Sequence, residues 1–255
     1  MLKKRLKNIP NQLLKLLPNR GLPQENWDVT VRHPNFGYAK FEQSYSHLPH
    51  ELQDHFEYYS QEKRGFGDRS LHVMWHVLHR TLRIESFLEI GVYRGKSLSL
   101  NAMLQQRNGL VQNVVGISPL ENIGDSVSAY EVLDYAADIR ANFAHFGLDA
   151  PKLVKAYSTD DVAKAEIASH KWDCIYIDGN HDYDIVLEDW NNCADALADG
   201  GIIVMDDAGM FTRYKAFGGG FTGHPGPSQV ASEVVSGRFR KILQVDHNIV
   251  FQKAG

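Results

Sequence analysis

Short apolar runs alternate with longer amphipathic segments along the chain from residue 86 onward. The apolar runs predict strands, and the amphipathic segments between them predict helices. The predicted strands are 86–90, 113–117, 152–156, 172–177 and 201–205, and the predicted helices are 95–106, 127–146, 160–169 and 183–198. Gly147 and the pair Gly200-Gly201 stand where the second and fourth of these helices are expected to end.

This alternation is typical of an α/β protein in which a parallel sheet is covered on both faces. Two further apolar runs, 240–245 and 249–253, flank the turn Asp246-His247-Asn248. Strands joined by so short a turn form a hairpin, so at least one of them runs antiparallel to the rest. We therefore predict a Rossmann-like, doubly wound sheet that is mostly parallel and ends in a C-terminal antiparallel hairpin.

The first 65 residues are more polar and contain several prolines. We predict an N-terminal helical arm that is irregular over residues 20–60, apart from one helix near 50–63 that ends at Gly65. A stronger helix is predicted at 70–83, with Ser70 as its cap. Apolar residues recur through that helix at helical spacing: Leu71, Trp75, Leu78, Leu82. The predicted domains are an arm at 1–65 and an α/β domain at 66–255.

Composition excludes several classes of protein. The formal net charge of −4 gives no overall attraction to nucleic acid. No stretch approaches the roughly 18 apolar residues of a transmembrane span. The basic N-terminus, residues 1–21, fits a solvated end, although it leaves open a weak peripheral contact with a membrane. Cys174 and Cys193 lie in apolar stretches, which suits core residues of a cytoplasmic protein. We also expect a homo-oligomer.

The segment FLEIGVYRGKSLSL, residues 87–100, is predicted to run from a strand through a turn into a helix. Gly91 and Gly95 let the backbone approach a ligand, and the following helix offers unpaired N–H groups. The spacing E-x-G-x-x-x-G-x-S matches neither the G-x-G-x-x-G of dinucleotide-binding turns nor the G-K-[ST] ending of a phosphate-binding loop. Glu89, ahead of the first glycine, suits a ligand that contains an ammonium group.

This turn resembles motif I of class I S-adenosylmethionine-dependent methyltransferases, and the resemblance extends through WDCIYIDGNHDYDIVLEDW and ADGGIIVMDD. In that family the turn holds the methionine part of the cofactor, which implies contacts here from Glu89, Gly91, Tyr93, Gly95 and Ser97. The family usually places an acidic residue after the second strand for the ribose hydroxyls. This chain has Ser118 there, with Glu121 as the other candidate. Tyr157 and Ser158 are candidates for the adenine, and a plain turn is the alternative.

Carboxylates follow the fourth and fifth predicted strands. Asp178 begins the segment Asp178-Gly179-Asn180-His181-Asp182, and Asp206-Asp207 follow the fifth strand. The carboxyl ends of neighbouring parallel strands meet at one edge of a sheet, where ligands bind. Three carboxylates that converge there repel one another unless a proton or a cation intervenes. A divalent cation bound through oxygen, most simply Mg²⁺, fits this cluster.

The same pattern is similar to that of metal-dependent sugar and small-molecule O-methyltransferases, the group that contains macrocin O-methyltransferase. This resemblance implies that Asp178, Asp206 and Asp207 bind the metal and that His181 is the general base, with Asp178 also bordering the cofactor. A metal lowers the pKa of a bound hydroxyl, and an imidazole can then accept its proton at neutral pH. The alternative is structural, with Asp178 as a helix cap and Asp206-Asp207 in a solvated loop.

Together these patterns predict transfer of a methyl group from S-adenosyl-L-methionine to a hydroxyl of a sugar or polyol-bearing metabolite, such as a glycan or a glycosylated natural product. A divalent cation, Mg²⁺ or another, would polarise the acceptor. A catalytically silent cofactor-binding module in a biosynthetic complex is the main alternative. A nicotinamide-dependent oxidoreductase disagrees with the glycine spacing. The loop at 208–227 is a candidate substrate lid.

Overall fold

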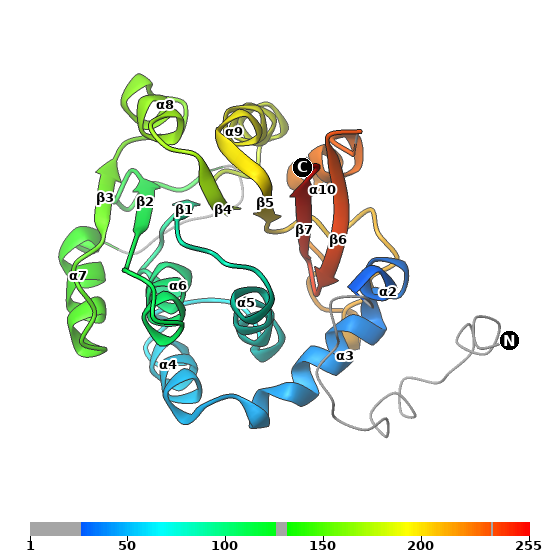
Figure 1. Ribbon diagram of the computed structural model, residues 1–255, viewed down its shortest axis with the longest axis horizontal. Coiled ribbons are helices and arrows are strands. Elements are labelled where there is room, and N and C mark those ends of the chain that lie inside the picture. Colours follow the sequence, from blue (N-terminus) through cyan, green and yellow to red (C-terminus); the bar gives the residue numbers. More distant parts are fainter. Residues whose placement is uncertain (1–26, 126–131, 236) are drawn as a thin grey trace, which may run out of the picture.

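The computed structural model describes residues 27–125, 132–235 and 237–255. The basic terminus at 1–21 and part of the predicted helix at 127–146 lie outside them. The described residues form a seven-stranded sheet in the order β3-β2-β1-β4-β5-β7-β6 (Figure 1). Its strands are β1 (Phe87–Ile90), β2 (Val114–Ser118), β3 (Lys152–Lys155), β4 (Trp172–Ile177), β5 (Leu197–Met205), β6 (Phe239–Val245) and β7 (Asn248–Lys253).

The strand directions follow from the connections between them. Strands β1 to β5 pair in parallel, because each is joined to the next by a connection that contains a helix. β7 pairs antiparallel with both β5 and β6, and the turn between β6 and β7 consists of Asp246 and His247. The predicted Rossmann-like sheet, mostly parallel with a C-terminal hairpin, is therefore confirmed.

Helices cover both faces of the sheet (Figure 1). α8, α9 and α10 lie on one face, and α5, α6 and α7 lie on the other with α3 and α4 beyond them. Each face has its own hydrophobic core, and residues of β1, β4 and β5 alternate between the two. The helices after residue 48 are α4 (His50–Ser60), α5 (Arg69–Thr81), α6 (Lys96–Arg107), α7 (Tyr135–His145), α8 (Asp161–Ala168), α9 (Tyr183–Ala196) and α10 (Pro225–Glu233).

The arm is more ordered than its prolines predict. Residues 27–47 form α2 (Trp27–Arg32), α3 (Pro34–Ser44) and the short 3₁₀ helix η4 (Tyr45–His47), so the predicted irregular segment is wrong there. Pro34 occupies the first turn of α3, where a missing N–H costs no hydrogen bond. Trp27 and Phe41 are almost fully buried in the core that also contains Val245 of β6. The arm therefore shares a core with the sheet.

Three helix ends differ from the prediction. α4 ends at Ser60 because Glu62 and Lys63 adopt positive φ angles before Gly65 is reached. The cap position of α5 is Asp68, whereas Ser70 faces the core, where its side chain is fully buried. α9 ends at Ala196, so that Gly200 and Gly201 lie within β5 rather than after a helix. The sequence pattern thus predicted these helix ends, but it placed them a few residues from where the helices begin or end.

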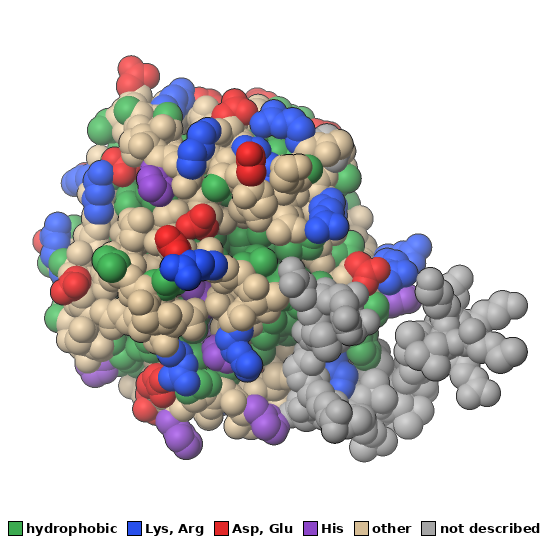
Figure 2. Space-filling view, viewed as in Figure 1, with side chains coloured by type: hydrophobic (Ala, Val, Ile, Leu, Met, Phe, Trp, Pro, Cys, Tyr) green, Lys and Arg blue, Asp and Glu red, His purple; other side chains and the backbone are tan. Residues whose placement is uncertain are grey.

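Neither acidic nor basic side chains dominate the face of the molecule in view. Acidic and basic side chains are interspersed over the described residues of that face, in keeping with the small net charge (Figure 2). Within the described ranges, every helix is too short or too polar to cross a membrane. Both free cysteines, Cys174 and Cys193, are buried, as their apolar surroundings predict.

Thr30 fastens the arm to the sheet and offers a test of this packing. Its hydroxyl donates to the carbonyl of Trp27 at 2.7 Å and accepts the backbone N–H of Gln244 at 2.9 Å. Thr30→Val should lower the free energy of unfolding by about 1–3 kcal/mol, because it leaves that buried N–H without a partner.

Chemical denaturation measures this loss. Thr81→Val is the matched control, since the Thr81 hydroxyl donates to the carbonyl of Val77 at an exposed helix end. The control should change stability by less than about 0.5 kcal/mol. Equal effects of the two substitutions would contradict the role assigned to Thr30.

Candidate functional site

The glycine turn after β1 brings the ends of three strands together. Gly91 has a φ of +93°, and a Cβ atom there would lie 1.9 Å from the carbonyl oxygen of Asp178. The N–H of Gly91 donates to the carbonyl of Ile117 at 2.9 Å, and the N–H of Asp178 donates to that of Ile90 at 2.9 Å. Only glycine fits both this conformation and this contact. The carboxyl ends of β1, β2 and β4 therefore meet at Gly91.

Gly95 shapes the same turn from the start of α6. It has a φ of +84°, and its carbonyl accepts hydrogen bonds from the hydroxyls of Ser99 and Tyr59 at 2.7 and 3.2 Å. The walls of the two cavities described next do not include Gly95 among the residues that the structure places. Its positive φ accounts for a glycine at this point of the turn, and its contact with the cofactor stays a prediction.

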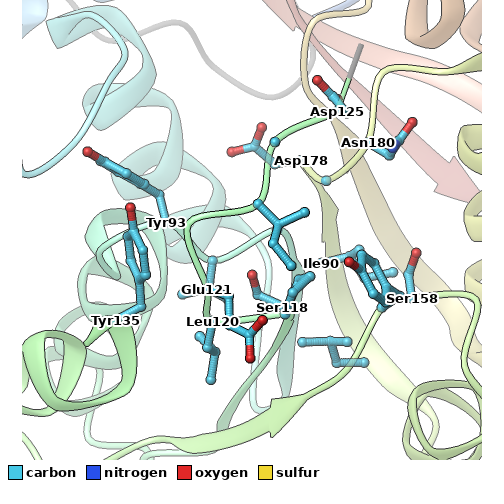
Figure 3. A pocket seen from close by; sticks show the side chains of 18 of the residues that line it. Ile90, Tyr93, Ser118, Leu120, Glu121, Asp125, Tyr135, Ser158, Asp178 and Asn180 are labelled. Carbon is cyan, nitrogen blue, oxygen red and sulfur yellow. The ribbon is translucent and has the colours of Figure 1, made fainter. Parts of the chain in front are cut away.

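A first cavity opens at the carboxyl ends of β1, β2 and β4 (Figure 3). Its wall includes the predicted residues Gly91, Tyr93, Ser118, Glu121, Tyr157, Ser158 and Asp178. It also includes residues that sequence analysis missed: Phe66, Leu120, Ile123, Asp125, Tyr135 and Asn180. The rings of Tyr93 and Tyr135 lie side by side with centroids 5.8 Å apart. The cavity thus combines apolar and aromatic walls with a few polar groups, as small-molecule sites do.

The two candidates for the missing acidic residue after β2 differ in exposure. Glu121 is exposed at the rim, where its carboxylate pairs with Lys155 at 2.7 Å. Ser118 is half-buried, and its backbone carbonyl accepts the N–H of Ala156 at 3.1 Å. Ser118 is therefore the better shielded of the two polar groups in this part of the cavity.

A second cavity adjoins the first. The two share Phe66, Gly91, Tyr93 and Asp178 as wall residues. The wall of the second includes the predicted residues Glu89, Ser97, His181, Asp206 and Asp207. Further wall residues that sequence analysis did not place there are His72, Trp75, Lys96, Tyr176, Phe221, His224 and His247. The polar residues that follow β1, β4 and β5 are thus gathered in one place.

Lys96 and His72 build the side of the second cavity away from the carboxylates. The Lys96 ammonium donates to the carbonyls of Phe66 and Gly67 at 2.7 and 3.1 Å, and burial lowers the pKa of Lys96 to about 8. Burial also lowers the pKa of His72 to about 3, so this imidazole is neutral at physiological pH. Lys96 holds the segment before α5, with Phe66, against both cavities.

Glu89 is buried on β1, with 3% of its surface exposed. Its Oε2 atom has no hydrogen-bond partner among the described residues. Burial, together with the nearby Asp206, raises the pKa of Glu89 well above its usual range. A buried carboxyl oxygen without a partner is costly, so this part of the second cavity favours a ligand that donates hydrogen bonds or has positive charge.

Three carboxylates meet where β4 and β5 end. Asp178 and Asp206 are hydrogen-bonded to each other, and Asn248 also donates to Asp206. Burial and the charge of Asp206 raise the pKa of Asp178 well above its usual range. Burial acts in the same direction on Asp206, but the His247 imidazole outweighs it and holds the pKa of Asp206 below its usual range. The cluster thus relies on a shared proton and an imidazole to balance its negative charge.

Asp207 directs its two carboxylate oxygens toward different histidines. Its Oδ2 atom lies 2.9 Å from Nε2 of His181 and 3.7 Å from Nε2 of His224. Its Oδ1 atom lies 3.6 Å from Nε2 of His247. The φ of Asp207 is +52°, which is unusual for a residue other than glycine. The backbone N–H of His224 and the hydroxyl of Ser228 both donate to its carbonyl and hold this conformation.

His181 lies between two carboxylates. Its Nδ1 atom is 2.6 Å from Oδ2 of Asp125, and that oxygen also accepts the backbone N–H of His181 at 2.9 Å. Burial acts to lower the pKa of His181, but Asp207 and Asp125 outweigh it and raise that pKa. Because Nδ1 faces Asp125, Nε2 is the ring nitrogen that faces Asp207.

Sequence analysis missed Asp125 and His247, whereas His224 belongs to the loop at 208–227 that it predicts as a substrate lid. A signal for His247 was present, because a hairpin that returns beside β5 brings its turn next to Asp206-Asp207. The pairing of Met205 with Ile249 shows this placement. Asp125 offers no comparable pattern, since it lies in a loop well past the end of β2.

Comparison with known proteins identifies the domain. Residues 88–208 match the model of a family described as a methyltransferase domain. An uncharacterized protein of Acanthamoeba polyphaga mimivirus is 27% identical over 154 residues, a match that covers 57% of this chain and 63% of the relative. The chain thus spans less than two thirds of that relative's length.

Solved structures share the fold at low sequence identity. The SAH-bound Podospora anserina methyltransferase PaMTH1 has a TM-score of 0.56 at 16% identity, covering 82% of this chain and 89% of that one. An O-methyltransferase from Bacillus cereus in complex with SAH has a TM-score of 0.56 at 14% identity, covering 91% and 100%. The O-methyltransferase NovP has a TM-score of 0.53 at 15% identity, covering 71% and 78%.

Residues 88–208 thus match a methyltransferase domain, and the described residues share the fold of solved methyltransferases. Both findings agree with the predicted relation to class I S-adenosylmethionine-dependent methyltransferases. The narrower resemblance to macrocin-type enzymes stays a prediction.

The contact at Gly91 predicts an unequal response to alanine. Gly91→Ala should lower the free energy of unfolding by at least ~2 kcal/mol more than Gly147→Ala, because only the first Cβ collides with backbone. Gly147 also has a positive φ, of +66°, but open space around it. Chemical denaturation of both variants measures the difference, and equal losses would show that β1 and β4 separate without cost.

Proposed function

We propose that this chain is an O-methyltransferase that transfers a methyl group from S-adenosyl-L-methionine to a hydroxyl of a sugar or polyol-bearing metabolite, with a divalent cation at the carboxylate cluster. The observation that supports this most strongly is the junction of the two cavities at Gly91, Tyr93 and Asp178. A cofactor that spans the junction would present its reactive end to the second cavity. Bound S-adenosylmethionine supplies a methyl group on a sulfonium centre.

The residues of the first cavity fit the cofactor. Gly91 leaves room for a ligand against the backbone, and Tyr157, half exposed at the rim, offers an aromatic face to a base. The unpartnered oxygen of Glu89 suits the ammonium group of the methionine part, which would lie toward the second cavity. Ser118 is the better candidate for the ribose because Glu121 is already paired with Lys155.

The residues of the second cavity fit a divalent cation. Asp206 and Asp207 would hold it, because one oxygen of each lies within 4.8 Å of the other and of His247. Asp178, which is hydrogen-bonded to Asp206, would complete the predicted set. A bound cation lowers the pKa of a coordinated hydroxyl. The O-methyltransferases among the similar structures support transfer to oxygen.

His181 is the best-placed general base. Asp125 accepts the hydrogen of Nδ1, which fixes the ring, and Nε2 lies 2.9 Å from Oδ2 of Asp207 in the cavity wall. Asp207 would raise the pKa of His181 less if it shared its charge with a cation. Asp125 therefore acts as a positioning residue, in the way that a carboxylate orients the imidazole in other acid–base pairs.

A first test concerns the cofactor cavity. Tyr157→Ala should weaken binding of S-adenosylmethionine by roughly 5- to 100-fold, the range expected for a lost stack between a base and an aromatic ring. Isothermal titration calorimetry measures it. Val162→Ala is the control, because Val162 is an exposed apolar residue outside both cavity walls. No binding by the unaltered protein would refute the proposed cofactor.

A second test concerns the cation and the base. With a panel of glycosides and polyols as acceptors, methyl transfer should be lost on chelation and restored by a divalent cation. His181→Ala should lower the rate by about 10²- to 10⁴-fold. His170→Ala, at an exposed position, should leave it unchanged. Turnover that is insensitive both to chelator and to His181→Ala would refute the cation and the role of His181 as base. Cofactor binding without any methyl transfer would favour the catalytically silent cofactor-binding module.

A further inference from the structure

The turn between β6 and β7 adds a nitrogen donor to the carboxylate cluster. We propose that His247 is a metal ligand, and that the centre is a mixed imidazole–carboxylate site that selects a first-row transition cation such as Mn²⁺ over Mg²⁺. This inference rests on the proposed cation at Asp206 and Asp207, but it changes both the ligand set and the metal that the sequence predicts.

The first support is the position of the imidazole. Nε2 of His247 lies 3.3 Å from Oδ1 of Asp206 and 3.6 Å from Oδ1 of Asp207. One donor atom from each of these three residues lies within 4.8 Å of the other two. Donors around one cation at about 2.1 Å are separated by roughly 3 Å or slightly more. The three atoms are therefore spaced as neighbouring ligands of one ion.

The second support is the partner of the other ring nitrogen. Nδ1 of His247 lies 3.2 Å from Oδ1 of Asp246. Tyr214 in turn is hydrogen-bonded to the Asp246 side chain. Metal-bound histidines almost always direct their second nitrogen to a carboxylate or carbonyl, which fixes the ring and strengthens the donor. Asp246 places a carboxylate beside this nitrogen of His247 at ion-pair distance, without the geometry of a hydrogen bond.

The backbone also holds His247 in place. Its carbonyl accepts the N–H of Ala208 at 2.9 Å, directly after Asp207. The hairpin turn is thus tied to the end of β5, and the Cα of His247 packs against Gly209, where a Cβ would come within 2.9 Å of it. A donor fixed to the same backbone as its neighbouring ligands needs little reorganisation to bind.

The two oxygens of Asp207 keep the metal and the base apart. Oδ1 faces His247, whereas Oδ2 faces His181. An ion on the Oδ1 side therefore leaves the contacts of His181 with Asp125 and with Oδ2 of Asp207 in place. Imidazole suits Fe²⁺ and Zn²⁺, and Mn²⁺ accepts it beside carboxylates, whereas Mg²⁺ prefers oxygen ligands and retains its waters.

The competing explanation is that His247 is a protonated counter-charge for the acids. The two explanations predict opposite effects of removing it. A ligand contributes to affinity, so its loss weakens the binding of a transition metal. A positive charge opposes a cation, so its loss strengthens the binding of every divalent ion.

The experiment uses the full chain, freed of metal and titrated with Mn²⁺ and with Mg²⁺ by calorimetry. We expect the unaltered protein to bind Mn²⁺ more tightly than Mg²⁺. His247→Ala should weaken Mn²⁺ binding by about 10- to 100-fold and change Mg²⁺ binding much less. Pulsed electron paramagnetic resonance of bound Mn²⁺ should show coupling to an imidazole nitrogen that His247→Ala removes and His170→Ala preserves.

Asp246→Asn provides a second variant in case His247→Ala does not fold, which circular dichroism would reveal. It should weaken Mn²⁺ binding by about 10-fold with the nitrogen coupling retained. Tighter binding by His247→Ala, unchanged nitrogen coupling in that variant, or no binding of Mn²⁺ by the unaltered protein would overturn the proposal. Methyl transfer is measured separately. If bound Mn²⁺ shows the nitrogen coupling but no methyl transfer is found, the proposed function alone is refuted. If methyl transfer occurs with Mg²⁺ and His247→Ala does not change Mg²⁺ binding, this inference alone is refuted.

Discussion

The close contact between Gly91 and the carbonyl of Asp178 is the constraint on which the rest of the site depends. Any side chain at residue 91 would push the ends of β1 and β4 apart. Since the two cavities share their wall at this point, their connection exists only while the strands remain in contact. The same contact places the carboxylate of Asp178 at the boundary between them. The requirement for glycine at residue 91 thus determines where the carboxylate of Asp178 lies.

Bringing the strand ends together also concentrates negative charge, and the protein balances it with imidazoles. His181 lies between Asp125 and Asp207, and His247 lies between Asp246 and the Asp206-Asp207 pair. In each case a carboxylate lies beside the ring nitrogen that is turned away from Asp207, and for His181 it is hydrogen-bonded to that nitrogen. The two arrangements approach opposite oxygens of Asp207. The geometry therefore supports two separate roles, a base on one side and a metal ligand on the other.

Hydrophobic periodicity and the glycine spacing were enough to predict the sheet, its helices and the glycine turn, because these features depend on residues near one another in sequence. The helices at 27–44 were missed because prolines that begin a helix resemble those of an irregular segment. Asp178, His181, Asp206 and Asp207 were predicted to converge because parallel strands share an edge. Asp125 reaches the cluster through a loop, and its proximity depends on tertiary packing that local patterns do not encode. His247 lies in the predicted hairpin turn, and the pairing of β7 with β5 brings that turn to Asp206-Asp207.

The place of β7 has a consequence for how the protein is made. β7 lies between β5 and β6, so β5 has no neighbour on that side until residues 248–253 have been synthesised. The turn that contributes His247 cannot take its place beside Asp206 before then. During translation the glycine turn and the first cavity, whose described wall lies within residues 66–185, can therefore form before the turn of His247 reaches the carboxylates. The second cavity, whose wall includes His247, is completed last.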